Sequence, residues 1–100
     1  MIICRSADHQ EPVLVTFRVS DADLRDRRIS VVGDFNSWDR TADLLWEQTP
    51  GTHVLTLAMT PGRYRFRYVT SDGRWFDDEG AHGYENNGFG QQNCVLELVG

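Results

Sequence analysis

The sequence predicts an antiparallel β-sandwich. Short apolar segments with strand-like alternation recur along the chain, turns rich in glycine, proline and aspartate separate them, and no segment has a convincing helical period. We expect about six to eight strands, including residues 29–32, 63–69 and 94–99. A chain of 100 residues can bury a single core, so we expect one domain.

The cleanest alternation in the chain lies between residues 63 and 68, where arginine and aromatic residues take turns. Successive side chains of a strand point to opposite faces, so one face should pack in the core while the other carries guanidinium groups. We expect the aromatic positions to be core rather than a ligand platform. They are Tyr64, Phe66 and Tyr68, and the arginine positions are Arg63, Arg65 and Arg67.

The remaining segments predict the boundaries of the domain. Residues 1–11 are expected to be a loose N-terminal lead-in, and residues 12–99 the domain itself. A strand is expected from Pro12 onward, and residues 41–47 predict a turn followed by a brief strand. Residues 80–93 are rich in glycine and asparagine, and so long a loop in a small domain is typically functional or disordered.

Composition narrows the class of partner. The formal net charge of −5 argues against nucleic acid and against an anionic membrane surface, because both attract a basic field. The chain begins with an apolar run shorter than the roughly 7–15 residues of a signal peptide, and no run approaches the ~20 residues of a membrane span. We therefore expect a cytoplasmic protein in which Cys4 and Cys94 are free thiols, the alternative being a Cys4–Cys94 disulfide and another compartment.

Two tryptophans, Trp38 and Trp75, each follow a turn and so leave strand ends rather than a core face. Flat aromatic rings on rigid turns suit the apolar C–H face of a sugar, while arginine, asparagine and glutamine suit its hydroxyl groups. Arg67, Gln91 and Asn93 are side chains of that type. The alternative is that the tryptophans only seal the end of the core.

Catalysis is not expected. The adjacent acids at 77–79 invite comparison with the paired carboxylates of a glycosidase, but neighbours in a polar loop are usually a solvated charge run. The three histidines lack the spacing of a metal site, and the glycines near the C-terminus lack the strand-to-helix junction of a phosphate loop. We expect no metal and no cofactor.

An ordered set of motifs resembles the glycogen-binding module, also called carbohydrate-binding module family 48. This family includes the β subunit of AMP-activated kinase and the N-terminal domains of isoamylases and glucan-branching enzymes. The resemblance covers about residues 12–99. Its motifs are GDFNSWD at 33–39, Leu57 with Pro61 and Gly62, YRFRY at 64–68, DGRW at 72–75 with Asp77, and NGFG at 87–90 with Asn93.

The resemblance implies an immunoglobulin-like early-set sandwich that binds α-1,4-linked glucan, with Trp38 and Trp75 stacking on glucose rings. Arg67 falls where glycan-binding members carry a lysine that hydrogen-bonds sugar hydroxyls, and Phe89 falls at an apolar residue that reaches the glucose units. Two polar positions follow it, where a threonine and an asparagine are familiar. The implied carbohydrate-binding residues are Trp38, Arg67, Trp75, Phe89, Gln91 and Asn93.

The sequence departs from the family pattern in three places: Arg67 for lysine, one extra residue near 70–71, and Gln91 for threonine. The implied partners are an α-glucan oligosaccharide or polysaccharide and a protein of glycogen metabolism. The alternative is an early-set packing or protein-interaction module that binds no sugar. A packing module has no reason to hold both Trp38 and Trp75 exposed on turns, so their exposure would distinguish a sugar-binding module from a packing module.

Overall fold

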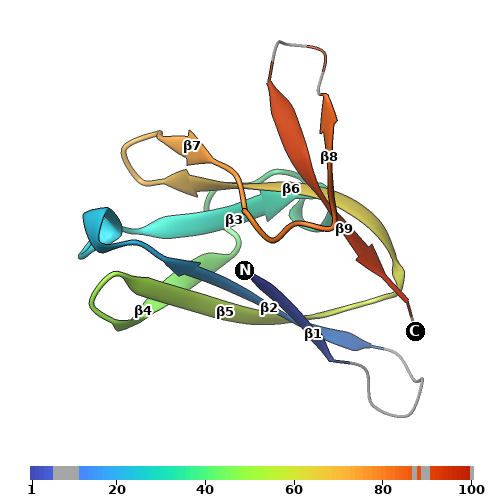
Figure 1. The fold of residues 1–100 in the computed structure, drawn as a ribbon, viewed down its shortest axis with the longest axis horizontal. Helices are drawn as coiled ribbons and strands as arrows, with labels where there is room; N and C mark the ends of the chain where they lie inside the picture. Colours follow the sequence, from blue (N-terminus) through green and yellow to red (C-terminus); the bar gives the residue numbers. More distant parts are fainter. Residues whose placement is uncertain (6–11, 87, 89–90, 100) are drawn as a thin grey trace.

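The computed structural model describes residues 1–5, 12–86, 88 and 91–99. They form one curled antiparallel sheet that folds over on itself as a sandwich (Figure 1), which confirms the all-β fold class. The described strands are β1 (Ile2–Arg5), β2 (Val13–Ser20), β3 (Ile29–Gly33), β4 (Leu44–Thr49), β5 (Thr52–Met59), β6 (Gly62–Thr70), β7 (Trp75–Phe76), β8 (Gly83–Asn86) and β9 (Gln92–Leu98). Two single-turn 3-10 helices, η1 (Ala22–Leu24) and η2 (Asp34–Asn36), flank β3.

The strand order is β1-β2-β5-β4-β3-β6-β9-β8, with β7 also paired to β6. The first four strands of this order make one layer, and the strands from β3 onward make the other (Figure 1). The two layers are joined where β4 crosses to β3, through only two residue pairs, Ile29 with Leu45 and Ser30 with Leu44. The core lies between the layers.

The arginine–aromatic alternation of β6 appears as expected. Phe66 and Tyr68 are buried, whereas Arg63 and Arg65 are exposed on the opposite face. Phe17 of β2 meets both buried rings edge-on, with centroid distances of 5.4 Å to Phe66 and 6.5 Å to Tyr68. Such aromatic pairs add about 0.5–1.5 kcal/mol each beyond the area they bury, so this cluster holds the two layers together.

Three expected strands are confirmed as β3, β6 and β9, and the brief strand expected within 41–47 as the start of β4. The expected number was too low, because the described residues contain nine strands. Residues 2–5, expected in a loose lead-in, form β1 and pair with β2 through Ile2 and Phe17. Residues 83–86, expected in a long loop, form β8 against β9. Both are edge strands that pair with one neighbour, and β8, with the sequence GYEN, has little strand propensity of its own. The domain start at residue 12 stays a prediction.

Strand β6 changes neighbour halfway along one of its edges. Along this edge Phe66 pairs with Cys94 of β9, but two residues later Tyr68 pairs with Phe76 of β7. The other edge is occupied by β3 throughout residues 66–70. Arg67 therefore sits where β6 changes its neighbour from β9 to β7.

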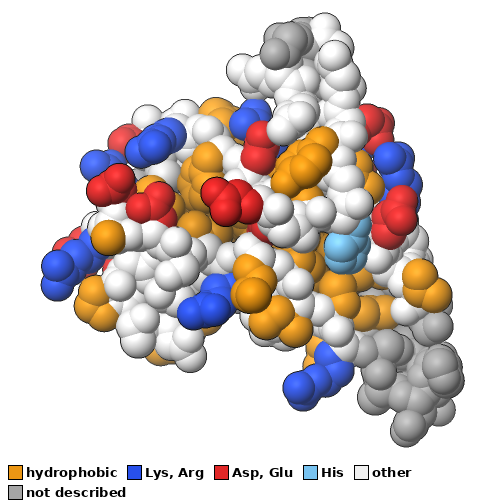
Figure 2. Space-filling model, in the orientation of Figure 1, with side chains coloured by type: hydrophobic (Ala, Val, Ile, Leu, Met, Phe, Trp, Pro, Cys, Tyr) orange, Lys and Arg blue, Asp and Glu red, His pale blue; other side chains and the backbone are white. Residues whose placement is uncertain are grey.

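Figure 2 shows the surface on the side viewed in Figure 1. Acidic and basic side chains are interspersed there, and apolar side chains reach the surface between them. Among the described residues, no helix has the length and apolar character needed to cross a membrane.

Candidate functional site

The loop that carries Trp38 is built on a close approach between β3 and β6. A Cβ atom at Gly33 would lie 2.4 Å from the carbonyl oxygen of Arg65, so only glycine fits at this point. The side chain of Asn36 then stabilises the loop through three hydrogen bonds. Its side-chain oxygen accepts from the Gly33 N–H at 3.0 Å, and its amide donates to the Val31 carbonyl at 3.0 Å and to Asp43 at 2.8 Å.

The backbone at the tip of this loop is strained. Ser37 and Trp38 have φ values of 57° and 59°, the left-handed region that side chains rarely adopt. The Trp38 N–H donates to the Gly33 carbonyl at 3.0 Å, and its indole N–H donates to Asp34 at 3.2 Å. Strain of this kind costs about 1–3 kcal/mol and clusters at functional sites, where a side chain must be held in one direction.

Asp34 connects this loop to the neighbouring strand. Its second carboxylate oxygen accepts from the backbone N–H of Arg65 at 2.9 Å and from the guanidinium Nε at 3.1 Å. Burial acts to raise the pKa of Asp34, but these hydrogen bonds and the one from Trp38 outweigh it and lower the pKa below its ordinary value of 3.8. Asp34 is thus held ionised at neutral pH.

Trp75 enters the site from the hairpin between β6 and β7. The turn at residues 71–74 closes through Gly73, which has a φ of 89°, and Thr70 accepts from the Arg74 N–H at 3.0 Å. Val69 pairs with Trp75 across the hairpin. This hairpin register places the guanidinium group of Arg67 beside the indole of Trp75.

Arg67 is held in the site by two side-chain hydrogen bonds. Its Nε donates to Asp77 and its Nη1 to the side chain of Gln91, both at 2.9 Å, and only 12% of its side chain is exposed. The guanidinium carbon lies 5.7 Å from the centre of the Trp75 ring, and that of Arg40, two residues after Trp38, lies 5.9 Å from the same ring. These distances permit cation–π attraction, which helps to fix the ring.

Five of the six expected site residues line one open pocket of about 540 Å³, which we call the tryptophan pocket. Trp75 is 40% exposed, as expected, whereas Trp38 was also expected to be exposed but is half-buried, because its indole N–H is bonded to Asp34. Phe89, implied by the resemblance, lies outside the described residues. Asn86 was not among the expected site residues, and Arg65 was expected only as one of three arginines on one face of a strand. The residues lining the pocket are Trp38, Arg65, Arg67, Trp75, Asn86, Gln91 and Asn93.

A third tryptophan is the most exposed of all. Trp46, on β4, has 67% of its surface exposed and is not among the described residues that line the tryptophan pocket. Its exposure could not be predicted, because the segment of sequence that carries it is short and irregular. It supplies a matched control for the other two.

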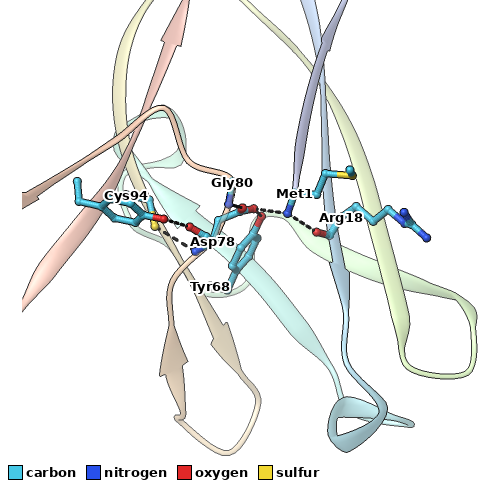
Figure 3. A network of polar contacts seen from close by, with 7 residues as sticks. Met1, Arg18, Tyr68, Asp78, Gly80 and Cys94 are labelled. Carbon is cyan, nitrogen blue, oxygen red and sulfur yellow. Dashed lines mark hydrogen bonds and ion pairs between the residues drawn. The ribbon is translucent and has the colours of Figure 1, made fainter.

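The segment after β7 is anchored by Asp78, whose side chain is fully buried. Its carboxylate accepts from the Tyr68 hydroxyl at 2.5 Å, the Gly80 N–H at 2.7 Å and the Met1 α-amino group at 2.8 Å (Figure 3). Its own N–H donates to the Cys94 sulfur at 3.2 Å. Burial and the Asp78 carboxylate both raise the pKa of Tyr68, so its hydroxyl stays a donor. This network fixes the segment, and with it the adjacent Asp77 that holds Arg67.

A β-sandwich that presents two tryptophan rings beside arginine and amide side chains in one open pocket is typical of a carbohydrate-binding module. The family model for the glycogen recognition site of AMP-activated protein kinase matches residues 23–99, and the chain belongs to this family. This membership confirms the resemblance and supports carbohydrate binding in general. A comparison with curated proteins gives no match.

Proposed function

We propose that this protein binds α-1,4-linked glucan, such as glycogen or starch, in the tryptophan pocket without changing it chemically. The observation that carries the proposal is the convergence of Trp38 and Trp75, from two separate turns, on one open pocket. Family membership supports the ligand class. In this proposal the two indoles stack on the apolar faces of glucose rings, and Phe89 adds an apolar contact.

The polar side chains of the pocket would bind the sugar hydroxyls. Arg67 has five N–H donors, and its contacts to Asp77 and Gln91 use one each, so further donors can reach a ligand. The amides of Gln91 and Asn93 both donate and accept, as hydroxyl groups do. Because Arg67 is held on two sides, little conformational entropy is lost when it binds.

The acidic residues nearby have structural partners, which supports binding without catalysis. Asp77 holds Arg67 through Nε, and Asp78 is buried against the Tyr68 hydroxyl. A glycosidase needs one carboxylic acid to protonate the leaving oxygen and a second carboxylate across the bond. Incubation with glycogen or amylose should therefore release no reducing ends.

The proposed partner is an α-glucan oligosaccharide or polysaccharide, together with a protein of glycogen metabolism that the domain would bring to the glucan. The proposed location is the cytoplasm, because Cys4 and Cys94 are both free thiols, as is usual in a reducing compartment. A protein-interaction module without sugar binding is the competing function. It is favoured by the exposed Trp46 on β4, which lies outside the tryptophan pocket.

Isothermal titration calorimetry with maltoheptaose and with β-cyclodextrin tests the proposal. Two stacked rings and a few hydrogen bonds, less the freedom lost on association, predict a Kd of roughly 10 μM to 1 mM, or about −7 to −4 kcal/mol. Cellohexaose, which has β-1,4 links and a straighter chain, serves as the control ligand and should bind more weakly. Absence of heat with both α-glucans at millimolar concentration would favour the interaction module.

A further inference from the structure

A second pocket of about 560 Å³ adjoins the tryptophan pocket and shares three residues with it: Arg67, Asn86 and Gln91. We call it the tyrosine pocket, because Tyr84 of β8 supplies its aromatic surface. We propose that an α-glucan chain continues from the tryptophan pocket past Arg67 into the tyrosine pocket, where its further glucose units bind. This inference rests on the proposed function and adds a preference for longer chains.

The side chains of the tyrosine pocket suit a neutral, hydroxyl-rich ligand. The amides of Asn86, Gln91 and Gln92 line it, and each can donate and accept hydrogen bonds. The charged groups are already compensated. Arg67 is paired with Asp77 at 2.9 Å, and Glu85 is paired with Arg63 at 2.8 Å. An ionic ligand would have to compete with these pairs, whereas a sugar would not.

Tyr84 offers a rigid aromatic surface. Its side chain is 46% exposed, and its hydroxyl donates to the backbone carbonyl of Asp78 at 2.5 Å. Asp78 is itself held by the Tyr68 hydroxyl and the Gly80 N–H (Figure 3). The ring is thus tied to a buried network, and an aromatic face fixed in advance binds a sugar ring at low entropic cost.

The size and continuity of the two pockets explain why one chain should occupy both. Each has a volume within the range of about 300–1,000 Å³ that holds a drug-sized ligand, so a short oligosaccharide fills one pocket only. Arg67 lines both pockets and lies where β6 changes its neighbour from β9 to β7. A chain lying across Arg67 reaches the amide of Gln92 beyond it.

Calorimetric titration of the wild type, Tyr84→Ala and Gln92→Met with maltotriose and maltoheptaose tests this inference. Both variants should bind maltoheptaose about three- to tenfold more weakly than the wild type, and bind maltotriose within about twofold of it. Tyr84→Phe keeps the ring but loses the hydroxyl that anchors it, so its maltoheptaose affinity should fall between those of the wild type and Tyr84→Ala. Tighter binding of maltoheptaose than of maltotriose by the wild type is not enough, because a longer chain can also bind the tryptophan pocket in more registers. The comparison between the wild type and the variants is therefore the test.

Retained maltotriose binding shows that a variant has an intact tryptophan pocket. If Tyr84→Ala no longer binds maltotriose, the result for Gln92→Met tests the inference instead. This second change should disturb the fold little, because the exposed Gln92 side chain makes one described side-chain hydrogen bond, to Asp77 at 3.3 Å. Unchanged maltoheptaose affinity in the variants would overturn the tyrosine pocket and leave the proposed function standing. Failure of the wild type to bind either sugar would instead overturn the proposed function, and this extension with it.

Discussion

The carboxylate of Asp34 holds Trp38 and Arg65 together: one oxygen accepts from the indole N–H at 3.2 Å, and the other accepts from the backbone and side chain of Arg65. This bridge attaches the strained loop to β6, so the ring of Trp38 faces the pocket in a set direction. Asp34→Ala should weaken maltoheptaose binding about three- to tenfold, because the indole must then be ordered on binding. Calorimetry measures the effect. Asp23→Asn, an exposed change on η1, should have no effect, and an equal loss in both variants would contradict the role of the bridge.

Stability at acid pH should report the same carboxylate. The folded-state pKa of Asp34 lies below its ordinary value of 3.8, so its contribution to the free energy of unfolding is fully present above that value. It is lost as the pH falls through the lower folded-state pKa, because the folded protein must then take up a proton that the unfolded chain already carries. Urea unfolding between pH 5 and pH 2.5 should show Asp34→Asn losing less stability than the wild type below about pH 4. Parallel curves for the two proteins would contradict this.

Arg67 and Arg63 lie on the same face of β6 but differ in their surroundings. Arg67 is held by Asp77 and Gln91 inside the pocket, whereas Arg63 pairs with Glu85 at the exposed surface. Arg67→Ala should reduce glucan affinity at least about tenfold, since a charge-assisted hydrogen bond contributes about 1.5–3 kcal/mol. Arg63→Ala should lose far less affinity, because Arg63 lines neither pocket and only pairs with Glu85. Calorimetry with maltoheptaose compares them, and equal affinities would remove Arg67 from the site.

The two cysteines should react at very different rates. Cys4 is exposed on β1, while Cys94 is buried on β9, where burial raises its pKa to about 11. Partial burial also raises the pKa of Cys4, although the residue is exposed. A thiol reagent at pH 8 should label Cys4 in the native protein and both cysteines after unfolding. Equal labelling of the two in the native state would contradict the buried placement of Cys94.

The sequence predicted the local parts of the site well. The alternation of residues along one strand is enough to place Arg67 on the face opposite the buried Phe66 and Tyr68, whatever strands pair with it. Turn residues before Trp38 and Trp75 likewise indicate that both lie at strand ends. Their meeting in one pocket follows from the pairing of β3 with β6, which brings the two turns together. The family resemblance anticipated this meeting.

Contacts that depend on how strands distant in the sequence pair with one another could not be predicted from the sequence. Asp77 was expected to be solvated, yet it supports Arg67, because β6 changes neighbour between Phe66 and Tyr68. Arg40 reaches Trp75 only through the folded path of its loop. Likewise, β8 lies in a segment of low strand propensity and forms because β9 offers it a free edge. Propensity cannot report contacts of this kind.

The central claim is that Trp38 and Trp75 bind glucan, and three alanine variants test it most directly. Maltoheptaose should not bind detectably to Trp38→Ala or Trp75→Ala, and should bind Trp46→Ala with wild-type affinity, because only the first two tryptophans line the tryptophan pocket. Calorimetry is the measurement, with thermal unfolding to show that each variant loses no more than about 1 kcal/mol of stability. The claim would be contradicted if Trp38→Ala and Trp75→Ala were folded and bound maltoheptaose as tightly as Trp46→Ala.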